Sequence, residues 1–343
     1  MRPTWAEVSL TALRHNFRTI QQYVAPKAKV CAVIKADAYG HGAVECARAL
    51  EAEGALWFGV ASVDEAIALR EAGIRGRILL LSGFWRGDEE AVLQYKLTPA
   101  VWESWHIERL EDAAARLKMH AVEGVPVHLK IDTGMARLGM NLKDVPGFLS
   151  SIQATEYVRL EGVFTHLASS EIVDSPDLDA QIGRYNHAVE LIQQAGLSPV
   201  YYHIANSAGI VSRPNAWKNM VRPGLALYGY HLPFTSVVSG APDVSRELPL
   251  RPVLSWKTRI ISMKEVPARQ PIGYNGAYVT SAPARIAALP VGYADGMNRH
   301  LSSRGRVIVR QDYAGIVGNV SMDLTLVDVT GIPGVALGDE VTL

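Results

Sequence analysis

The chain of 343 residues lacks the features that mark secreted, membrane and nucleic-acid-binding proteins. Its two cysteines, Cys31 and Cys46, cannot cross-link a chain of this size, and no Cys/His cluster has zinc-ligand spacing, so we expect a reducing compartment and no metal. No segment has an apolar run of the length that a signal peptide or a membrane span needs, which predicts a cytoplasmic protein without a membrane partner. Lys plus Arg and Asp plus Glu both number 34, so no excess of positive charge favours nucleic acid.

Hydrophobic residues make up 48% of the chain and charged residues 20%, which is enough apolar surface for a core and excludes disorder. From about residue 30 to residue 230, eight short β-branched and apolar runs alternate with stretches of helical spacing. The runs begin near Val30, Trp57, Arg77, Leu97, Val125, Val158, Val200 and Met220. The predicted helices cover residues 13–23, 44–53, 63–71, 89–94, 104–119, 142–153 and 179–194.

This alternation is typical of a (β/α)8 barrel, the α/β fold that we predict for the first part of the chain. A doubly wound open sheet is the alternative. It is disfavoured because the residues after the first run, KADAYGHG, contain no G-x-G-x-x-G fingerprint.

The pattern changes after about residue 233. The segment TSVVSGAPDVSREL (235–248) has the composition of a turn-rich linker, and strands without helices follow it. They are predicted at residues 253–266, 285–289, 306–309, 314–317 and 324–329. We therefore expect a barrel over residues 1–235 and an all-β domain over residues 236–343, with residues 1–10 as a candidate addition to the β-domain.

In a barrel of this kind the functional side chains lie at the carboxyl ends of the strands. Lys35 follows the apolar run VCAVI, and burial there would disfavour the charged amine and make it a nucleophile toward carbonyl carbon. The alternative is a lysine whose charged end reaches the solvent at the rim. Tyr39, Ser207 and the backbone N–H groups of Gly224 and Leu225 could hold a phosphate, and together with a Schiff-base lysine they suggest pyridoxal phosphate. The other polar residues at predicted strand ends are Asp37, Lys130, Asp132, Arg137, His166, Asn206 and Arg222, with strand eight beginning at Arg222.

Eight motifs in succession resemble those of the alanine racemases. They are AVIKADAYGHG (32–42), HLKIDTGMARLGM (128–140), FTHLASSE (164–171), HIANSAG (203–209), MVRPGLALYG (220–229), PIGYNGAY (271–278), LPVGYADGMNR (289–299) and GNVSMDLT (318–325). The resemblance implies a (β/α)8 barrel followed by a β-domain, pyridoxal phosphate as cofactor, a small amino acid as substrate, and a homodimer whose subunits share their active sites. The implied role is to supply D-alanine for peptidoglycan.

The resemblance implies that Lys35 bonds to the cofactor and acts as acid and base on one face of the substrate, and that Tyr274 of the second subunit is the opposing base. Racemisation needs such a pair, because one group removes a proton and the other returns one from the far side. Arg222 would donate to the pyridine nitrogen, and His166 would link Tyr274 to Arg222. The alternatives are an ordinary solvated Tyr274, a salt bridge of Arg222 with a carboxylate, and a core histidine at position 166.

Among the substrate residues, the resemblance implies that Arg137 binds the substrate carboxylate and that Lys130 is carried as a carbamate that positions Arg137. An ion pair between Lys130 and Asp132 is the alternative. Asn206 and Ser207 would belong to the cofactor site.

In the same way, Met322 and Asp323 would form a partner loop over the substrate, and Tyr293 would narrow the entrance to about the size of a methyl group. Such a pocket rejects one extra group by only ~1 to 3 kcal/mol, so a racemase for serine or a broader set of small amino acids is an alternative. A third possibility is a barrel that binds the cofactor without turnover, but Tyr274 and Met322 would then have no purpose. The family's chain continues past GDEVTL with a tyrosine that contacts the cofactor phosphate and lines the entrance. Either the β-domain is cut short in this sequence, or the phosphate is held by fewer groups, in which case we expect weaker cofactor retention.

Overall fold

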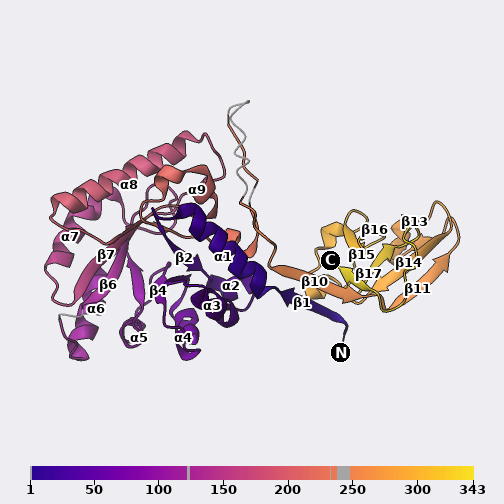
Figure 1. Cartoon of the computed structure of the whole chain (residues 1–343), viewed down its shortest axis with the longest axis horizontal. Helices are drawn as coiled ribbons and strands as arrows, with labels where there is room; N and C mark the ends of the chain where they lie inside the picture. The colour runs from indigo at the N-terminus through magenta and orange to yellow at the C-terminus, as the bar shows by residue number, and fades with distance from the viewer. Residues whose placement is uncertain (1, 122–123, 232, 238–247) are drawn as a thin grey trace. The chain divides into compact units, whose positions relative to one another are not determined.

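The computed structural model describes residues 2–121, 124–231, 233–237 and 248–343. The chain divides into a barrel domain, Leu10–Val253, and a β-domain, which consists of Met1–Ser9 together with Leu254–Leu343. The sequence predicted this boundary after residue 235, whereas the structure has it between Val253 and Leu254. Most of the predicted linker lies outside the described residues (Figure 1).

Eight parallel strands close the barrel, in the order in which they follow one another along the chain. Most residues of these strands are buried, as expected for parallel strands with helices outside them and side chains between them. This burial explains the continuous apolar runs in the sequence. The strands are β2 (Lys29–Val33), β3 (Trp57–Val60), β4 (Arg77–Leu80), β5 (Thr98–Val101), β6 (Val125–Lys130), β7 (Val158–Phe164), β8 (Tyr201–His203) and β9 (Met220–Val221).

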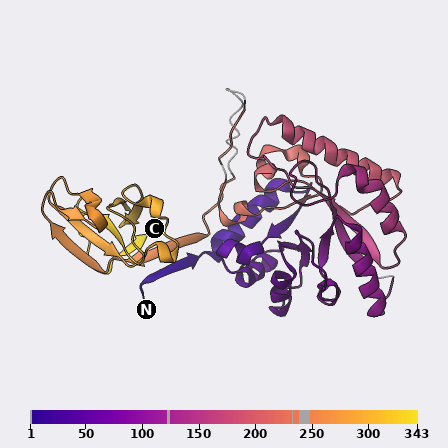
Figure 2. The ribbon, with the colours of Figure 1, turned by 180° about the vertical axis from the view of Figure 1, so that it is seen from behind.

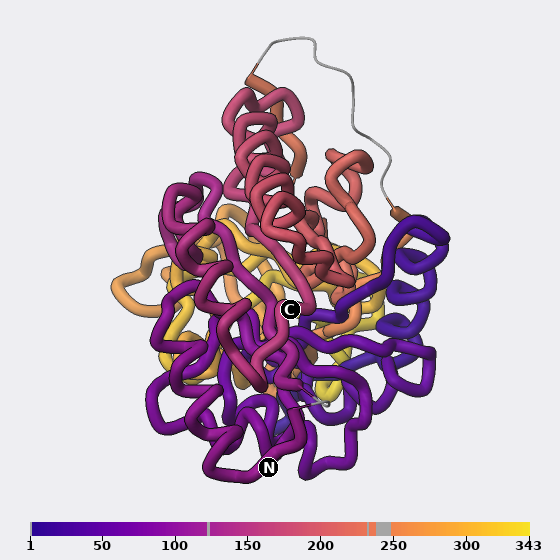
Figure 3. Tube along the Cα trace, turned by 90° about the vertical axis from the view of Figure 1, so that its left-hand side faces the viewer, coloured from indigo at the N-terminus to yellow at the C-terminus, as the bar shows by residue number. Residues whose placement is uncertain are grey.

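Helices surround these strands (Figures 1 and 3). In the first of them, Leu13, Phe17, Ile20 and Val24 fall on one buried face, which is the spacing that predicts an amphipathic helix. No helix in the described ranges is long and apolar enough to cross a bilayer. The α-helices are α1 (Leu10–Val24), α2 (Lys35–Gly40), α3 (Ala43–Ala52), α4 (Val63–Glu71), α5 (Glu89–Gln94), α6 (Ser104–Arg116), α7 (Val145–Gln153), α8 (Pro176–Gln194) and α9 (Ser207–Ser212). Short 3-10 turns are η1 (Leu142–Asp144), η2 (Pro214–Ala216), η3 (Leu225–Tyr228), η4 (Tyr274–Gly276), η5 (Tyr293–Asp295) and η6 (Arg299–Leu301).

The β-domain is built on an antiparallel sheet of eight strands in the order β1-β10-β18-β15-β16-β17-β14-β11, beside a two-stranded ribbon of β12 and β13. The amino-terminal strand pairs with β10 along its whole length, from Thr4 opposite Thr258 to Val8 opposite Leu254 (Figure 2). The strands are β1 (Thr4–Val8), β10 (Leu254–Arg259), β11 (Ser262–Val266), β12 (Pro271–Ile272), β13 (Tyr278–Val279), β14 (Ala284–Leu289), β15 (Arg306–Val309), β16 (Asp312–Ile316), β17 (Thr325–Asp328) and β18 (Glu340–Thr342).

Two sequence predictions are wrong in detail. The single strand expected over residues 253–266 is two strands, because the chain changes partners between them: Ile260 donates to the carbonyl of Asp339, whereas Ile261 donates to that of Ala288. Arg222 follows β9, which ends at Val221, and does not begin the strand. Its side chain is therefore free to lie across the end of the barrel.

Candidate active site

A cavity of about 390 Å³ lies at the carboxyl ends of the barrel strands. Its lining brings together ten residues that the sequence singles out from separate motifs, with Glu171 and Phe164 among the others. The ten are Lys35, Tyr39, Lys130, Arg137, His166, Asn206, Ser207, Arg222, Gly224 and Leu225. The structure thus places every barrel residue that we assigned to catalysis, cofactor or substrate in one cavity.

Lys35 and Tyr39 reach this cavity from an unusual turn. The four residues from Ala36 to Tyr39 all have φ between 51° and 56°, so the main part of α2 is a left-handed turn built from non-glycine residues. Such a conformation costs roughly 1–2 kcal/mol per residue. Glu65 offsets part of that cost, because its carboxylate accepts from the backbone of Ala36 and Ala61 at 2.7 Å each. Strain of this kind persists where the surrounding structure fixes it, and it is typical of functional sites.

One side of the cavity is a cradle of polar groups with no room for another side chain. The Ser207 hydroxyl accepts hydrogen bonds from the backbone of Gly224 at 2.9 Å and Ala226 at 3.2 Å. A Cβ atom on Gly224 would lie 2.5 Å from the Tyr39 hydroxyl, so any larger residue there would displace the Tyr39 side chain. Asn206 caps α9 by accepting from Gly209. The amides of Gly224 and Ala226 are thus engaged with Ser207, and the hydroxyls of Tyr39 and Ser207 beside the start of α9 make this side suited to a phosphate group.

Positive charge dominates the rest of the lining, with Lys35, Lys130, Arg137 and Arg222 around one small space. Burial, together with the charges of Arg222, Arg137 and Lys35, lowers the pKa of Lys130 to about 8. The Lys130 amine donates to the carbonyl of Leu81 at 2.9 Å. Such a cavity attracts anionic groups such as phosphate and carboxylate.

The alternative ion pair of Lys130 with Asp132 is not formed. A single oxygen of Asp132 instead accepts from the backbone of Gly134, Met135 and Ala136, at 2.9 to 3.1 Å. Asp132 therefore shapes the loop that leads to Arg137.

Arg222 is 3% exposed, and burial lowers its pKa to about 10, so the guanidinium stays protonated at neutral pH. It donates to Nδ1 of His203 at 2.8 Å and to the backbone carbonyls of Thr165 and Ile204 at 2.6 and 3.1 Å. Burial, followed by the charge of Arg222 and its neighbours, lowers the pKa of His166 to about 3, so this ring is neutral. The three hydrogen bonds of Arg222, to His203, Thr165 and Ile204, fix the direction in which its guanidinium points.

The sequence profile of the alanine racemase N-terminal domain matches residues 8–232, and that of the C-terminal domain matches residues 253–343. The chain belongs to the alanine racemase family. It is 42% identical to the alanine racemase of Syntrophobacter fumaroxidans over 100% of this chain and 88% of the relative. The alanine racemase of Clostridium difficile superposes with a TM-score of 0.87 at 34% identity, over 100% of this chain and 87% of the other. That of Bartonella henselae, solved with covalently bound pyridoxal phosphate, superposes with a TM-score of 0.85 at 30% identity, over 100% and 90%.

These relationships confirm the predicted fold, family and racemase activity, and the family depends on pyridoxal phosphate. The β-domain carries the residues that we expect to lie over the substrate. Tyr274, Tyr293 and Met322 are 72%, 47% and 55% exposed on the β-domain. Asp323 follows Met322 on the same exposed loop, which is joined to the backbone of Tyr274 by the side chain of Asn319 at 3.5 Å.

Sequence reasoning missed a column of polar side chains inside the barrel. It begins at Arg222 and passes through His203 and His128, whose facing ring nitrogens are 2.8 Å apart. It ends at Glu161 and Arg77, which form two hydrogen bonds at 2.8 and 2.5 Å. Gly162 leaves the space for His128, because a Cβ there would lie 2.6 Å from the ring. The only sequence signal was a polar residue inside each of three apolar strands.

The chemistry of the column fixes where its protons lie. Burial lowers the pKa of both His203 and His128, so both rings are neutral. Because a guanidinium can only donate, His203 accepts on Nδ1 and donates from Nε2 to His128. His128 then directs its remaining N–H toward a carboxylate oxygen of Glu161, 3.6 Å away, which is a favourable polar contact beyond hydrogen-bond length. All donors point the same way, from Arg222 toward Glu161.

We expect Glu161 to stabilise the barrel in a pH-dependent manner. Burial opposes its charge, but the polar contact with His128 and the hydrogen bonds from Arg77 outweigh burial and lower the pKa from 4.5 to about 2. The stabilisation is complete above the unfolded value and is lost as the pH falls toward 2. Glu161→Gln should lower the free energy of unfolding at neutral pH by roughly 2 kcal/mol, and the gap to the wild type should narrow between about pH 5 and pH 2.

Urea unfolding across this pH range measures the gap. Arg77→Met removes the partner instead of the carboxylate and should show the same weakened pH dependence. A gap between wild type and Glu161→Gln that stays constant down to about pH 3 would contradict the assignment.

Proposed function

We propose that the protein interconverts L- and D-alanine as a homodimer, using Lys35 of one subunit and Tyr274 of the partner subunit as opposing bases, and that it supplies D-alanine for peptidoglycan. The observation that carries this proposal is the convergence of Lys35, Arg222 and the Ser207 cradle in one cavity. The reactive amine and the phosphate-binding groups are thereby held together, as a pyridoxal phosphate enzyme requires.

The cavity residues fit the cofactor. The cradle around Ser207, Gly224 and Tyr39 would hold the phosphate, Lys35 would hold the aldehyde carbon, and Arg222 would face the pyridine nitrogen. Bound pyridoxal phosphate withdraws electrons, which allows the Cα–H bond of alanine to break with loss of a proton. Because Arg222 is protonated and held by His203, it keeps its own protons and donates a hydrogen bond without surrendering one. This arrangement restrains electron withdrawal and disfavours transamination.

The other residues bind and limit the substrate. Arg137 would hold the alanine carboxylate together with the backbone N–H of Met322 of the partner subunit, and Asp323 of the partner subunit belongs to the same covering loop. Tyr293 of the partner subunit would limit the side chain to about a methyl group. His166, neutral beside the ring, would join Tyr274 of the partner subunit to Arg222 by hydrogen bonds.

Lys130 would act through Arg137. Its lowered pKa leaves a substantial neutral fraction near pH 8, and a neutral amine is the form that adds to carbon dioxide. A carbamate would replace a cation by an anion and turn repulsion of Arg137 into attraction. Of the two readings in the sequence, the geometry favours this one, since Asp132 is engaged elsewhere.

The proposal includes a cytoplasmic location. Both cysteines are buried free thiols, as expected in a reducing compartment.

Borohydride trapping tests the role of Lys35. Purified protein should be yellow and should lose this colour when it is reduced with borohydride. The reduced cofactor should then stay covalently attached to the peptide that contains Lys35. Lys35→Ala should lower racemisation by roughly 10³-fold or more. Lys29→Ala is the matched control, because Lys29 begins the same strand at its other end, and its activity should be unchanged. A colourless protein that cannot be reconstituted, or one that racemises serine faster than alanine, would contradict the proposal.

Solvent deuterium exchange tests the role of Tyr274. Tyr274→Phe removes the phenol that we place on one face of the substrate, so exchange of the α-proton should fall by roughly 10²-fold for one enantiomer and far less for the other. Tyr313→Phe, on another exposed tyrosine of the β-domain, should leave both rates unchanged. Equal losses for the two enantiomers would count against the two-base assignment.

A further inference from the structure

The exposed residues of the β-domain that cover the substrate in our proposal lie on two segments, 290–297 and 318–324, which we call the gate loops. Their backbones are bonded to each other: Tyr293 donates to the carbonyl of Ser321 and Ala294 to that of Met322, both at 3.0 Å. At Gly292 a Cβ atom would lie only 2.3 Å from the Ser321 carbonyl oxygen. The gate loops are therefore held against each other by backbone hydrogen bonds and by close packing at Gly292.

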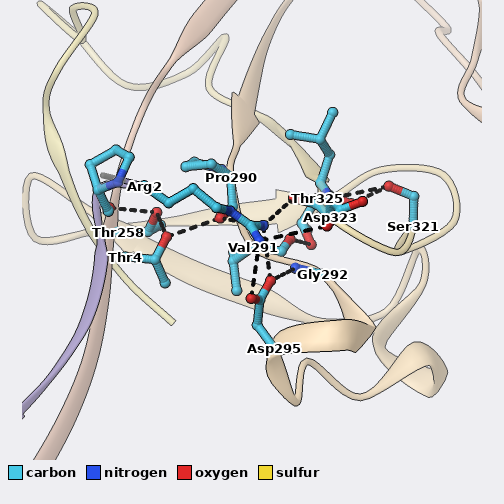
Figure 4. A network of polar contacts seen from close by, with 12 residues as sticks. Arg2, Thr4, Thr258, Pro290, Val291, Gly292, Asp295, Ser321, Asp323 and Thr325 are labelled. Carbon is cyan, nitrogen blue, oxygen red and sulfur yellow. Dashed lines mark hydrogen bonds and ion pairs between the residues drawn. The ribbon is translucent and has the colours of Figure 1, made fainter.

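The guanidinium of Arg2 sits where the gate loops meet (Figure 4). One of its nitrogens donates to the backbone carbonyls of Pro290 at 3.0 Å and Asp323 at 2.8 Å, one on each loop. The same group makes two hydrogen bonds to the carboxylate of Asp295, at 3.2 and 3.0 Å. Asp295 in turn accepts from the backbone of Gly292 at 2.9 Å. A planar fork of donors suits this task, and a lysine could not make all of these bonds at once.

Arg2 is itself anchored on the sheet. It precedes β1, which pairs with β10, and Thr4 donates to the same Pro290 carbonyl at 3.0 Å. The hydroxyls of Thr4 and Thr258 are 2.8 Å apart. The first residues of the chain therefore connect the gate loops to the antiparallel sheet and fix their position on it.

The energy of these contacts points to positioning more than to folding. The side chains of Arg2 and Asp295 are 45% and 27% exposed, and ion pairs near the surface add little to stability. These contacts instead reduce the conformational entropy of the two loops. Without them, the loops would have to become ordered when a ligand binds, which lowers the affinity for that ligand.

We propose that Arg2 is a positioning residue that locks the gate loops together, so that Tyr293 and the Met322 backbone are already in place for capture of a small amino acid. This inference rests on the proposed function, since it assigns the gate loops to the substrate entrance. It predicts that Arg2 acts on substrate binding and on the choice between alanine and serine, and not on proton transfer.

Steady-state kinetics of Arg2→Ala tests the inference. The KM for L-alanine should rise roughly five- to tenfold, with less than about a twofold change in kcat, because the loops must be ordered at each binding event. The ratio of kcat/KM for L-serine to that for L-alanine should rise as well, since the entrance is no longer held narrow. Arg2→Lys should fall between Arg2→Ala and the wild type.

Arg310→Ala is the matched control. Arg310 is another partly exposed arginine of the β-domain, bonded to Asp339 at 2.7 Å, and among the described residues it has no hydrogen bond or ion pair to the gate loops. Its KM and its serine-to-alanine ratio should be those of the wild type. A KM and a ratio that are unchanged in Arg2→Ala, or changed equally in Arg310→Ala, would overturn the inference while leaving the proposed function intact. A wild-type protein that does not racemise alanine would instead overturn the proposed function.

If Arg2→Ala does not fold, Asp295→Asn provides a second test. It removes the charge that Arg2 binds and keeps a side-chain oxygen for Gly292. The KM for L-alanine should again rise, and an unchanged KM would overturn the inference.

Discussion

A buried, protonated guanidinium is the constraint on which the rest of the barrel depends. Removing Arg222 from water is costly unless its donors are satisfied, and the barrel meets that demand with His203, two backbone carbonyls and a polar column that ends at Glu161 and Arg77. A barrel interior is usually filled by layers of branched apolar side chains. In this barrel, polar side chains occupy part of the interior and hold the guanidinium of Arg222 in a fixed orientation at the mouth of the cavity.

On the other side of the cavity, the chain likewise adopts an energetically costly conformation that positions functional side chains. The left-handed turn from Ala36 to Tyr39 carries strain, which Glu65 and the neighbouring helices hold in place. The turn brings the Lys35 amine and the Tyr39 hydroxyl into one space, and Gly224 provides the room for that hydroxyl. The Ser207 cradle and the positive lining already converge on this cavity in the chain itself.

The barrel could be predicted because buried parallel strands leave continuous apolar runs, and α1 and α8 leave a clear helical period. The cavity residues could be predicted because motifs at successive strand ends must converge. The polar column could not, since one histidine within an apolar strand gives no sign of its partner. The turn at α2 was missed because non-glycine residues rarely adopt positive φ, and α9 because it is only six residues long. The pairing of β1 with β10 joins residues that are far apart in sequence, and so the part played by Arg2 was also missed. The homodimer and its shared site stay predictions.

Mixing two inactive variants tests most directly whether Lys35 and Tyr274 act on one carbon from two subunits. Lys35→Ala and Tyr274→Phe should each be nearly inactive in racemisation, because each turnover needs both residues. After subunit exchange at equal concentrations, about half of the dimers should be mixed, and each mixed dimer should hold one site with both native residues. The account predicts recovery of about a quarter of the wild-type activity per chain. Mixed dimers that form but recover no activity would contradict it.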